Sequence, residues 1–293
     1  MSDLSLLEGL GQMEKKIVLF AFVLMMVMVC NSVVFALSLM GPPKALLGQD
    51  HWDIGIEYTH QTMDLDAIGK VTETMPEFDS VISRKDKHNI DDLKSNVIMI
   101  KAGYGINDNW DTFVRLGLAD VKGDLEHIFP DNAVPDDYRG FNGNFGFGWG
   151  FGTRATFWQE DEISWGGLFQ ITWLEPDDSS IGLLGDPGFT GYAEIDIREV
   201  QIAVGPTWQV DDNIRIYGGP FFHLVDGDFD INGRTVLEGT EIIMKTSGDV
   251  EEESQFGGYV GTNLDVNEDT SCFIECQLTG DAWGIGIGIA WRF

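Results

Sequence analysis

The sequence predicts an all-β fold: a closed antiparallel transmembrane β-barrel of about ten strands, preceded by a signal peptide. Three observations predict it. The chain has one long apolar run near its N-terminus, its later segments alternate apolar and polar residues with a period of two, and its connections alternate between tight turns and long polar stretches. The composition agrees, since 36 glycines, 9 prolines and 12% aromatic residues suit many strands and few helices.

The N-terminal apolar run covers residues 17–36 and follows two lysines. A short basic region, an apolar region and small residues before a cut are typical of a secretory signal, so we expect cleavage between Ala36 and Leu37. Met13 is the alternative start, and a membrane-spanning helix is the alternative structure for this run. The sequence therefore divides into a signal peptide at 1–36, a periplasmic N-terminal segment at 37–50 and a barrel at 51–293.

The strands have one apolar face and one small or polar face. At the C-terminus, tryptophan, isoleucine and phenylalanine residues alternate with glycine, alanine and arginine over residues 283–293. In a membrane barrel the apolar face meets lipid, the other face lines the lumen, and aromatic residues gather at the two membrane interfaces. The interface residues expected on this basis are Trp52, Trp110, Phe157, Trp165, Trp173, Trp208, Trp283, Trp291 and Phe293.

The connections between strands differ at the two ends of the barrel, as in membrane barrels. Tight turns are predicted at 107–109, 159–162, 211–213 and 267–270, and long polar loops at 67–92, 122–140, 175–190 and 227–249. Counting strands between these connections gives ten. Because the last of these loops contains apolar pairs, it could form an extra hairpin, and twelve strands is the alternative count.

The same alternation predicts which charged residues face the lumen. They are Glu57, Lys101, Arg115, Arg154, Glu199, Arg215, Glu275 and Arg292. If side chains close the lumen, these charges must pair, because an unpaired buried charge is costly. If water fills the lumen, they would select the solutes that pass. The glycine-rich inner face leaves volume that does not decide between these alternatives.

The formal net charge of −30 excludes nucleic acid as a partner, because a polyanion would be repelled. The acidic residues are expected on solvated surface loops.

The chain resembles the bacterial outer-membrane β-barrel superfamily. The resemblance rests on the signal peptide, the alternating strands, the unequal connections and the C-terminal Trp291-Arg292-Phe293, which is similar to that superfamily's terminal insertion signal. It implies the bacterial outer membrane as the location, outer-membrane lipid as a partner, and contact of the C-terminal strand with the barrel-insertion machinery. It carries over no catalytic residue.

Two weaker patterns could carry chemistry. Ten-strand members of this superfamily include the omptin proteases, which activate water with aspartates and an Asp/His couple at the outer rim; this chain has His127, His223, Asp226 and Asp228 there, without a matching motif. The residues Asp226, Asp228, Asp230 and Asn232, followed by Gly233, approach a calcium loop. However, the position of the bidentate acid falls on a glycine, and Glu238 misses it by one residue.

The leading functional prediction is a non-enzymatic outer-membrane barrel, either a narrow pore for small polar solutes or a structural scaffold with acidic surface loops. One alternative is an omptin-like hydrolase at the rim. Another is a secreted soluble β-sandwich or ligand-binding barrel. No cofactor motif is present, and calcium in the loop between Asp226 and Gly233 is the only metal that the sequence suggests.

Overall fold

The computed structural model describes residues 37–126, 139–177, 179–183, 186–237, 239–252 and 254–293. The expected signal peptide and His127 lie outside these residues. The described part is made of thirteen strands and the short 3-10 helix η1 (Pro76–Phe78), and it contains no helix that could cross a bilayer. The strands are β1 (Trp52–Met75), β2 (Ser80–Asn107), β3 (Trp110–Glu126), β4 (Arg139–Asn142), β5 (Asn144–Glu160), β6 (Ile163–Asp177), β7 (Ser179–Leu183), β8 (Asp186–Asp211), β9 (Ile214–Leu237), β10 (Thr240–Glu251), β11 (Phe256–Asp265), β12 (Thr270–Leu278) and β13 (Ala282–Arg292).

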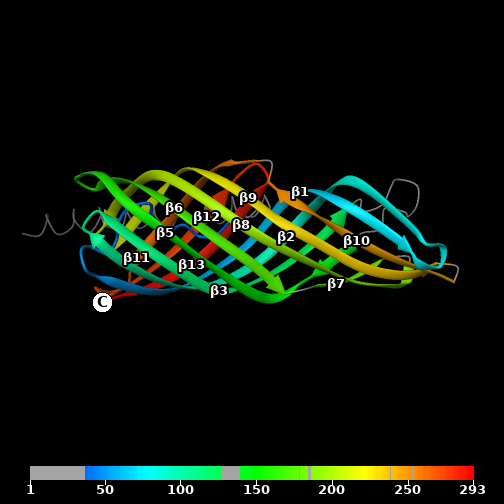
Figure 1. Ribbon diagram of the computed structural model, residues 1–293. Helices are drawn as coiled ribbons and strands as arrows, with labels where there is room; N and C mark the ends of the chain where they lie inside the picture. The colour runs from blue at the N-terminus through cyan, green and yellow to red at the C-terminus, as the bar shows by residue number, and fades with distance from the viewer. Residues whose placement is uncertain (1–36, 127–138, 178, 184–185, 238, 253) are drawn as a thin grey trace, which may run out of the picture.

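Ten of these strands form a closed antiparallel ring (Figure 1). Its order is β1, β2, β3, β5, β6, β8, β9, β11, β12 and β13, and β13 pairs with β1 to close it, from Asp53 opposite Arg292 to Met63 opposite Ala282. The four predicted tight turns all lie at one end, which we name the turn end. The structure therefore confirms the closed barrel and the count of ten strands.

The long polar loops are the main correction to the predicted fold. Most of their described residues form strands instead, because β1 and β2 continue as one hairpin to Met75 and Ser80, and β9 and β10 continue to Leu237 and Thr240. The extra hairpin considered for residues 227–249 is present. It extends the barrel along its axis and adds no strand to the ring of ten.

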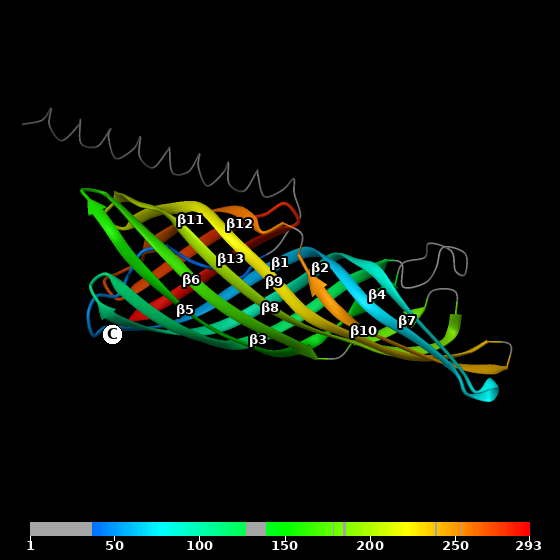
Figure 2. The same cartoon turned by 45° about the horizontal axis from the view of Figure 1, so that its top comes forward.

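Beyond the ring of ten, the described strands close a second and narrower ring, which we name the extension. Here β10 lies between β9 and β1 and takes the place of β11, β12 and β13 (Figure 2). On the other side of the extension, β4 and β7 take the places that β5 and β6 have in the ring of ten. β4 pairs with β3, β7 pairs with β8, and the single residue pair Phe141 and Ile181 joins β4 to β7. The extension has eight strands, and fewer strands enclose a narrower barrel.

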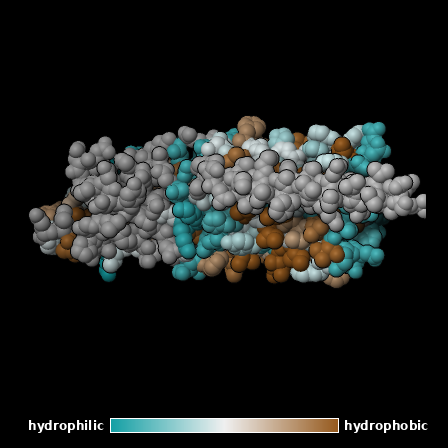
Figure 3. Space-filling view, turned by 180° about the vertical axis from the view of Figure 1, so that it is seen from behind, coloured by the Kyte–Doolittle hydropathy of each residue, from teal (hydrophilic) through white to brown (hydrophobic). Residues whose placement is uncertain are grey.

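Around the ring of ten, apolar side chains point outward. Ile56, Ile100, Leu116, Phe147 and Ile287, one from each of five strands, are 46–57% exposed. Figure 3 shows apolar side chains gathered on this part of the wall between two polar bands. A contiguous exposed apolar surface of this kind is what a lipid bilayer covers, and a soluble β-sandwich would instead bury it. We name this surface the membrane belt.

In the extension the two faces exchange character. Its interior is apolar, with Leu65, Leu93, Leu174, Ile197 and Val250 all no more than 3% exposed. Its outer face carries the acidic residues, which the sequence predicted for loops. The chain therefore combines a barrel with a polar lumen and an apolar exterior with a water-facing barrel that has an apolar core.

Candidate functional site

The lumen of the ring of ten is occupied by the chain's own residues 37–47, which we name the N-terminal segment. Leu37, Leu39 and Met40 are at most 2% exposed, although the segment forms no strand. It runs from the inner face of β13, where Leu37 lies against Gly284, to the turn end, where β1 begins. The expectation of a periplasmic segment at 37–50 is therefore wrong for residues 37–47, which lie inside the barrel.

The lumen wall holds this segment through its backbone. The N–H groups of Met40 and Gly41 each donate to the carboxylate of Glu275 at 2.9 Å. Nearer the turn end, the N–H of Leu46 donates to Asp111 at 2.6 Å. Buried backbone groups need such partners, and a segment without regular secondary structure must find them on side chains.

Carbonyl groups of the segment are satisfied in the same way. The amide nitrogen of Gln277 donates to the carbonyl of Ser38 at 2.9 Å, and the side chains of Arg115 and Gln170 both donate to the carbonyl of Leu39. These donors come from β12, β3 and β6, so contacts to the segment reach around the lumen.

Inward-facing glycines make room for the segment. A β-carbon on Gly284 would lie 2.6 Å from the carbonyl oxygen of Leu37, and one on Gly286 would lie 2.7 Å from the side chain of Leu39. Separations this short do not occur between non-bonded heavy atoms of these types. The volume that the glycine-rich inner face leaves free is thus filled by the N-terminal segment.

The structure places all eight predicted lumen residues on the inner side of the wall. Seven are no more than 8% exposed, and Arg292 is half-buried near the turn end. Glu57 forms the centre of the main cluster, with Lys101 and Arg115 each 3.1 Å from its carboxylate. Separately, Arg154 lies 3.9 Å from Asp111. Opposite charges placed this close offset much of the cost of burying them.

A third cluster closes the turn end, where Asp265 pairs with Arg215 and, at 2.9 Å, with Arg292. Asp111 and Asp265 were not among the predicted residues. The period of two could have found Asp111, because it shares its face with Arg115 on the same strand. Nothing in the sequence pattern pointed to the N-terminal segment as their neighbour.

The residues proposed for a rim hydrolase do not come together. His223 is fully buried inside the barrel and lies 2.5 Å from Glu252, whereas Asp226 and Asp228 point outward from the same strand. Asp226 pairs there with Arg198. Because inward and outward residues are separated by the barrel wall, His223 and Asp226 cannot act on one water molecule.

The residues of the expected calcium loop form part of β9 instead. Asp226, Asp228 and Asp230 are exposed at alternate positions of an extended strand, which does not curl around a cation as a calcium loop does. No group of three metal-ligating side chains suited to a metal ion occurs in the part of the chain that the structure describes. Calcium binding by these residues therefore stays a prediction without a loop to support it.

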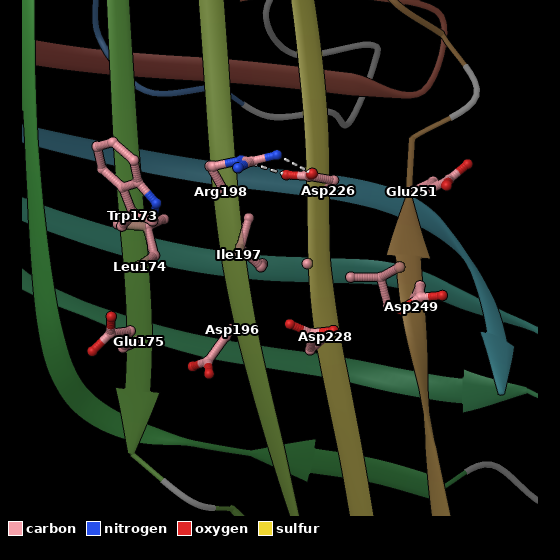
Figure 4. Close-up of a pocket in the computed structure, with 12 residues that line it drawn as sticks. Trp173, Leu174, Glu175, Asp196, Ile197, Arg198, Asp226, Asp228, Asp249 and Glu251 are labelled. Carbon is pink, nitrogen blue, oxygen red and sulfur yellow. Dashed lines mark hydrogen bonds and ion pairs between the residues drawn. The ribbon is translucent and has the colours of Figure 1, made fainter. Parts of the chain in front are cut away.

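These aspartates belong to an acidic surface on the outer face of the extension (Figure 4). Asp196, Asp228 and Asp249 are direct neighbours across β8, β9 and β10, and Glu175 continues the row on β6. Burial first, and then the carboxylates of Glu175, Asp228 and Asp230, raise the pKa of Asp196 above its ordinary value. Like charges placed directly opposite each other destabilise a strand pair.

The predicted interface aromatics lie on the outer wall. Trp52, Trp110, Phe157, Trp165, Trp208, Trp291 and Phe293 are exposed near the turn end, and Trp173 and Trp283 are half-buried near the start of the extension. Trp173 stacks on Trp149 with ring centroids 4.1 Å apart.

No family model matches the sequence, and no curated protein matches it. Among solved structures, the chain is similar to the outer membrane protein OprG from Pseudomonas aeruginosa (10% identity, TM-score 0.47, covering 84% of this chain and 97% of that one). It is also similar to the outer membrane protease OmpT from Escherichia coli (9% identity, TM-score 0.42, 88% and 99%) and to the toluene transporter TbuX from Ralstonia pickettii (9% identity, TM-score 0.33, 86% and 92%). OprG and OmpT are both outer-membrane proteins.

Proposed function

We propose that this outer-membrane β-barrel is a sealed, non-enzymatic scaffold that holds the acidic extension outside the membrane. The observation that carries the proposal is the N-terminal segment, which fills the lumen and is hydrogen-bonded to its wall from Glu275 down to Asp111. A second barrier lies above it, because the interior of the extension is a packed apolar core that ions would have to cross without water. Both barriers favour the scaffold over the narrow pore.

Planar-bilayer recording tests the proposal. We expect the inserted wild-type protein to give no conductance steps, because neither barrier leaves a hydrated path. A variant that lacks residues 38–47 should stay silent too, since the apolar core of the extension remains. Insertion of each protein into the bilayer is checked by quenching of the fluorescence of the exposed interface tryptophans with brominated lipid.

The opposite result would be reproducible conductance steps in the wild type. A true pore through this lumen would change its conductance on Arg115→Ala or Arg154→Ala, because both side chains lie inside the wall. Arg198→Ala is the matched control, because this arginine lies on the outer surface and should leave such a conductance unchanged. Conductance steps that change with the two lumen variants and not with the control would show that the protein is a channel and not a sealed scaffold.

A further inference from the structure

Glu199 is a buried carboxylate in the lumen with no basic partner among the residues that the structure describes. It lies on β8 and is 1% exposed. One oxygen accepts a hydrogen bond from the hydroxyl of Ser38, and the other lies 3.4 Å from the amide nitrogen of Gln61. Burying an ionised carboxylate with only neutral partners is unfavourable, because the carboxylate loses its hydration and gains no opposite charge in return.

The neighbouring lumen carboxylates are better satisfied. Glu57 has Lys101 and Arg115, and Glu275 accepts two backbone N–H groups as well as the amide of Gln277 at 2.6 Å. Glu275 also has no basic partner in the described part of the chain, but three donors satisfy it, whereas Glu199 has one hydroxyl donor and one amide nitrogen at 3.4 Å. Glu199 is thus the least satisfied of these three carboxylates.

The start of the expected mature chain lies beside Glu199. Ser38, which donates to Glu199, directly follows Leu37, and Leu37 is itself fully buried inside the wall. Hydrolysis of the bond between Ala36 and Leu37 by a signal peptidase would consume one water molecule and leave a carboxylate on Ala36 and an ammonium group on Leu37. That ammonium would lie one residue from the Ser38 hydroxyl.

We infer that the α-ammonium group of Leu37, created by removal of residues 1–36, binds Glu199 and fixes the N-terminal segment in the lumen. The inference rests on the expected cleavage site and on the position of the segment, and it holds whether or not the barrel conducts. It makes processing a structural step: the uncleaved chain has a neutral peptide nitrogen at Leu37, and only the mature chain supplies the charge.

The other ionisable groups around this place are already engaged. Arg115 faces the segment from β3 but pairs with Glu57, and Glu275 faces it from β12. Towards the extension, the buried His223 lies 2.5 Å from Glu252, which also accepts from the hydroxyl of Thr279 at 3.0 Å. None of these groups supplies a free cation for Glu199.

The test combines blocking of the α-amine with a neutral variant of Glu199. The N-terminus of protein isolated from membranes is first identified by mass spectrometry and should be Leu37. Unfolded mature protein is then acetylated near pH 6.5, where lysine side chains, with a pKa of about 10.4, stay protonated and unreactive. Free and acetylated chains are refolded in detergent, and trypsin cleavage after Lys44 reports release of the segment.

In the wild type we expect acetylation to speed this cleavage about tenfold or more, because a buried carboxylate loses its only cation. In Glu199→Gln the free and acetylated chains should be cleaved at the same rate. Asp265→Asn is the matched control: its carboxylate pairs with Arg215 and Arg292 at the turn end, so acetylation should still act as in the wild type.

If Glu199→Gln refolds poorly, pH gives the same answer with the wild type alone. The difference between free and acetylated chains should be present near pH 6.5 and should vanish well above the titration of a free α-amine, at about pH 8. An N-terminus other than Leu37, or an acetylation effect of equal size in wild type and Glu199→Gln, would overturn the inference. Conductance is measured separately, so the outcome does not depend on the proposed scaffold function.

Discussion

At the scale of single residues, the lumen is stabilised by buried charges, and the contribution of each charge to stability depends on its partners. Glu57 on β1 pairs with Lys101 on β2 and with Arg115 on β3, and it is only 3% exposed. Removing Glu57 leaves Arg115 buried without this acidic partner and leaves Lys101 with Asp53 at 4.0 Å. The stability of the ring of ten should therefore be sensitive to this carboxylate.

We predict that Glu57→Gln lowers the free energy of unfolding by about 3–5 kcal/mol, the usual cost of breaking a buried ion pair. Urea unfolding in lipid vesicles, followed by tryptophan fluorescence, measures it. Asp226→Asn is the control, because Asp226 and its partner Arg198 are both about half exposed, and exposed pairs contribute at most about 1 kcal/mol. Equal effects of the two substitutions would contradict the importance of burial.

On the extension, the row of aspartates should make stability depend on pH. Since the pKa of Asp196 is raised, its contribution to stability is fully present below its unfolded pKa and is lost as the pH rises through the folded pKa. We predict that Asp228→Asn stabilises the protein at pH 7 by a few tenths to about 1 kcal/mol and flattens the loss of stability as the pH rises above about 4, the ordinary pKa of an aspartate.

Urea midpoints at several pH values measure this effect. Glu268→Gln is a suitable control, because Glu268 is exposed in the turn between β11 and β12, far from the aspartate row. A stability curve that Asp228→Asn leaves unchanged would show that the aspartates are fully screened.

The sequence predicted which residues face the lumen but not how they pair. A period of two assigns Glu57 and Lys101 to the inner face, whereas their contact depends on the register between β1 and β2, which alternation alone does not set. The pattern behind the calcium prediction has two interpretations for a related reason. The alternate spacing of Asp226, Asp228 and Asp230 is also the spacing of one face of a strand, and the structure uses it in that way.

At the scale of elements, the N-terminal segment depends on two glycines of β13 that leave space for it. A side chain at Gly284 would overlap the backbone of Leu37. The segment is held by many hydrogen bonds but by no strand pairing, so a local clash can displace it without opening the ring of ten.

We therefore predict that Gly284→Val expels the N-terminal segment and makes Lys44, which is partly buried in the wild type, accessible to trypsin. Cleavage after Lys44 should become at least about tenfold faster, which corresponds to about 1.4 kcal/mol of lost binding. Gly258→Ala is the control, because a β-carbon there meets only one atom, 3.9 Å away. If Gly284→Val stayed as resistant to trypsin as the wild type, the strands of the wall must shift to accommodate the valine side chain while the segment stays in place.

No pattern in residues 37–47 could have revealed this arrangement. The segment lacks a period, and its partner Glu275 lies 235 positions away from Met40 along the chain. Contacts of this kind are decided by the space left inside the finished barrel, and the glycine-rich face indicated only that such space exists.

At the scale of the whole molecule, the ring of ten and the extension are stabilised in different ways, because their polar and apolar faces point in opposite directions. Lipid covers the apolar side of the ring of ten, whereas the extension must bury its own apolar side chains in water. The core of the extension should therefore respond to truncation in the same way as the core of a soluble protein.

We predict that Leu174→Ala costs about 2–5 kcal/mol, since Leu174 is fully buried in that core. The same urea experiment measures the cost, with Val236→Ala as control, because Val236 is 61% exposed near the end of β9. Surface substitutions of this kind usually change stability by no more than about 0.5 kcal/mol. A small effect of Leu174→Ala would contradict a tightly packed core.

The sequence predicted the barrel and its ten strands because every strand of the ring obeys one rule, an apolar face for lipid and a small or polar face for the lumen. It missed the extension because acidic residues were taken as a sign of loops. In residues 228–231, inside the loop predicted at 227–249, Asp228 and Asp230 alternate with Phe229 and Ile231, which is the pattern of a strand with an acidic outer face and an apolar inner one.

The replacement of three strands by one has a consequence for the order of assembly. A chain that ends at Glu251 already contains all eight strands of the extension, whereas the membrane-embedded ring still lacks β11, β12 and β13. The extension can thus close first, which leaves a gap between β1 and β9 in the ring of ten. β11, β12 and β13 would then enter this gap together and close the membrane-embedded ring last.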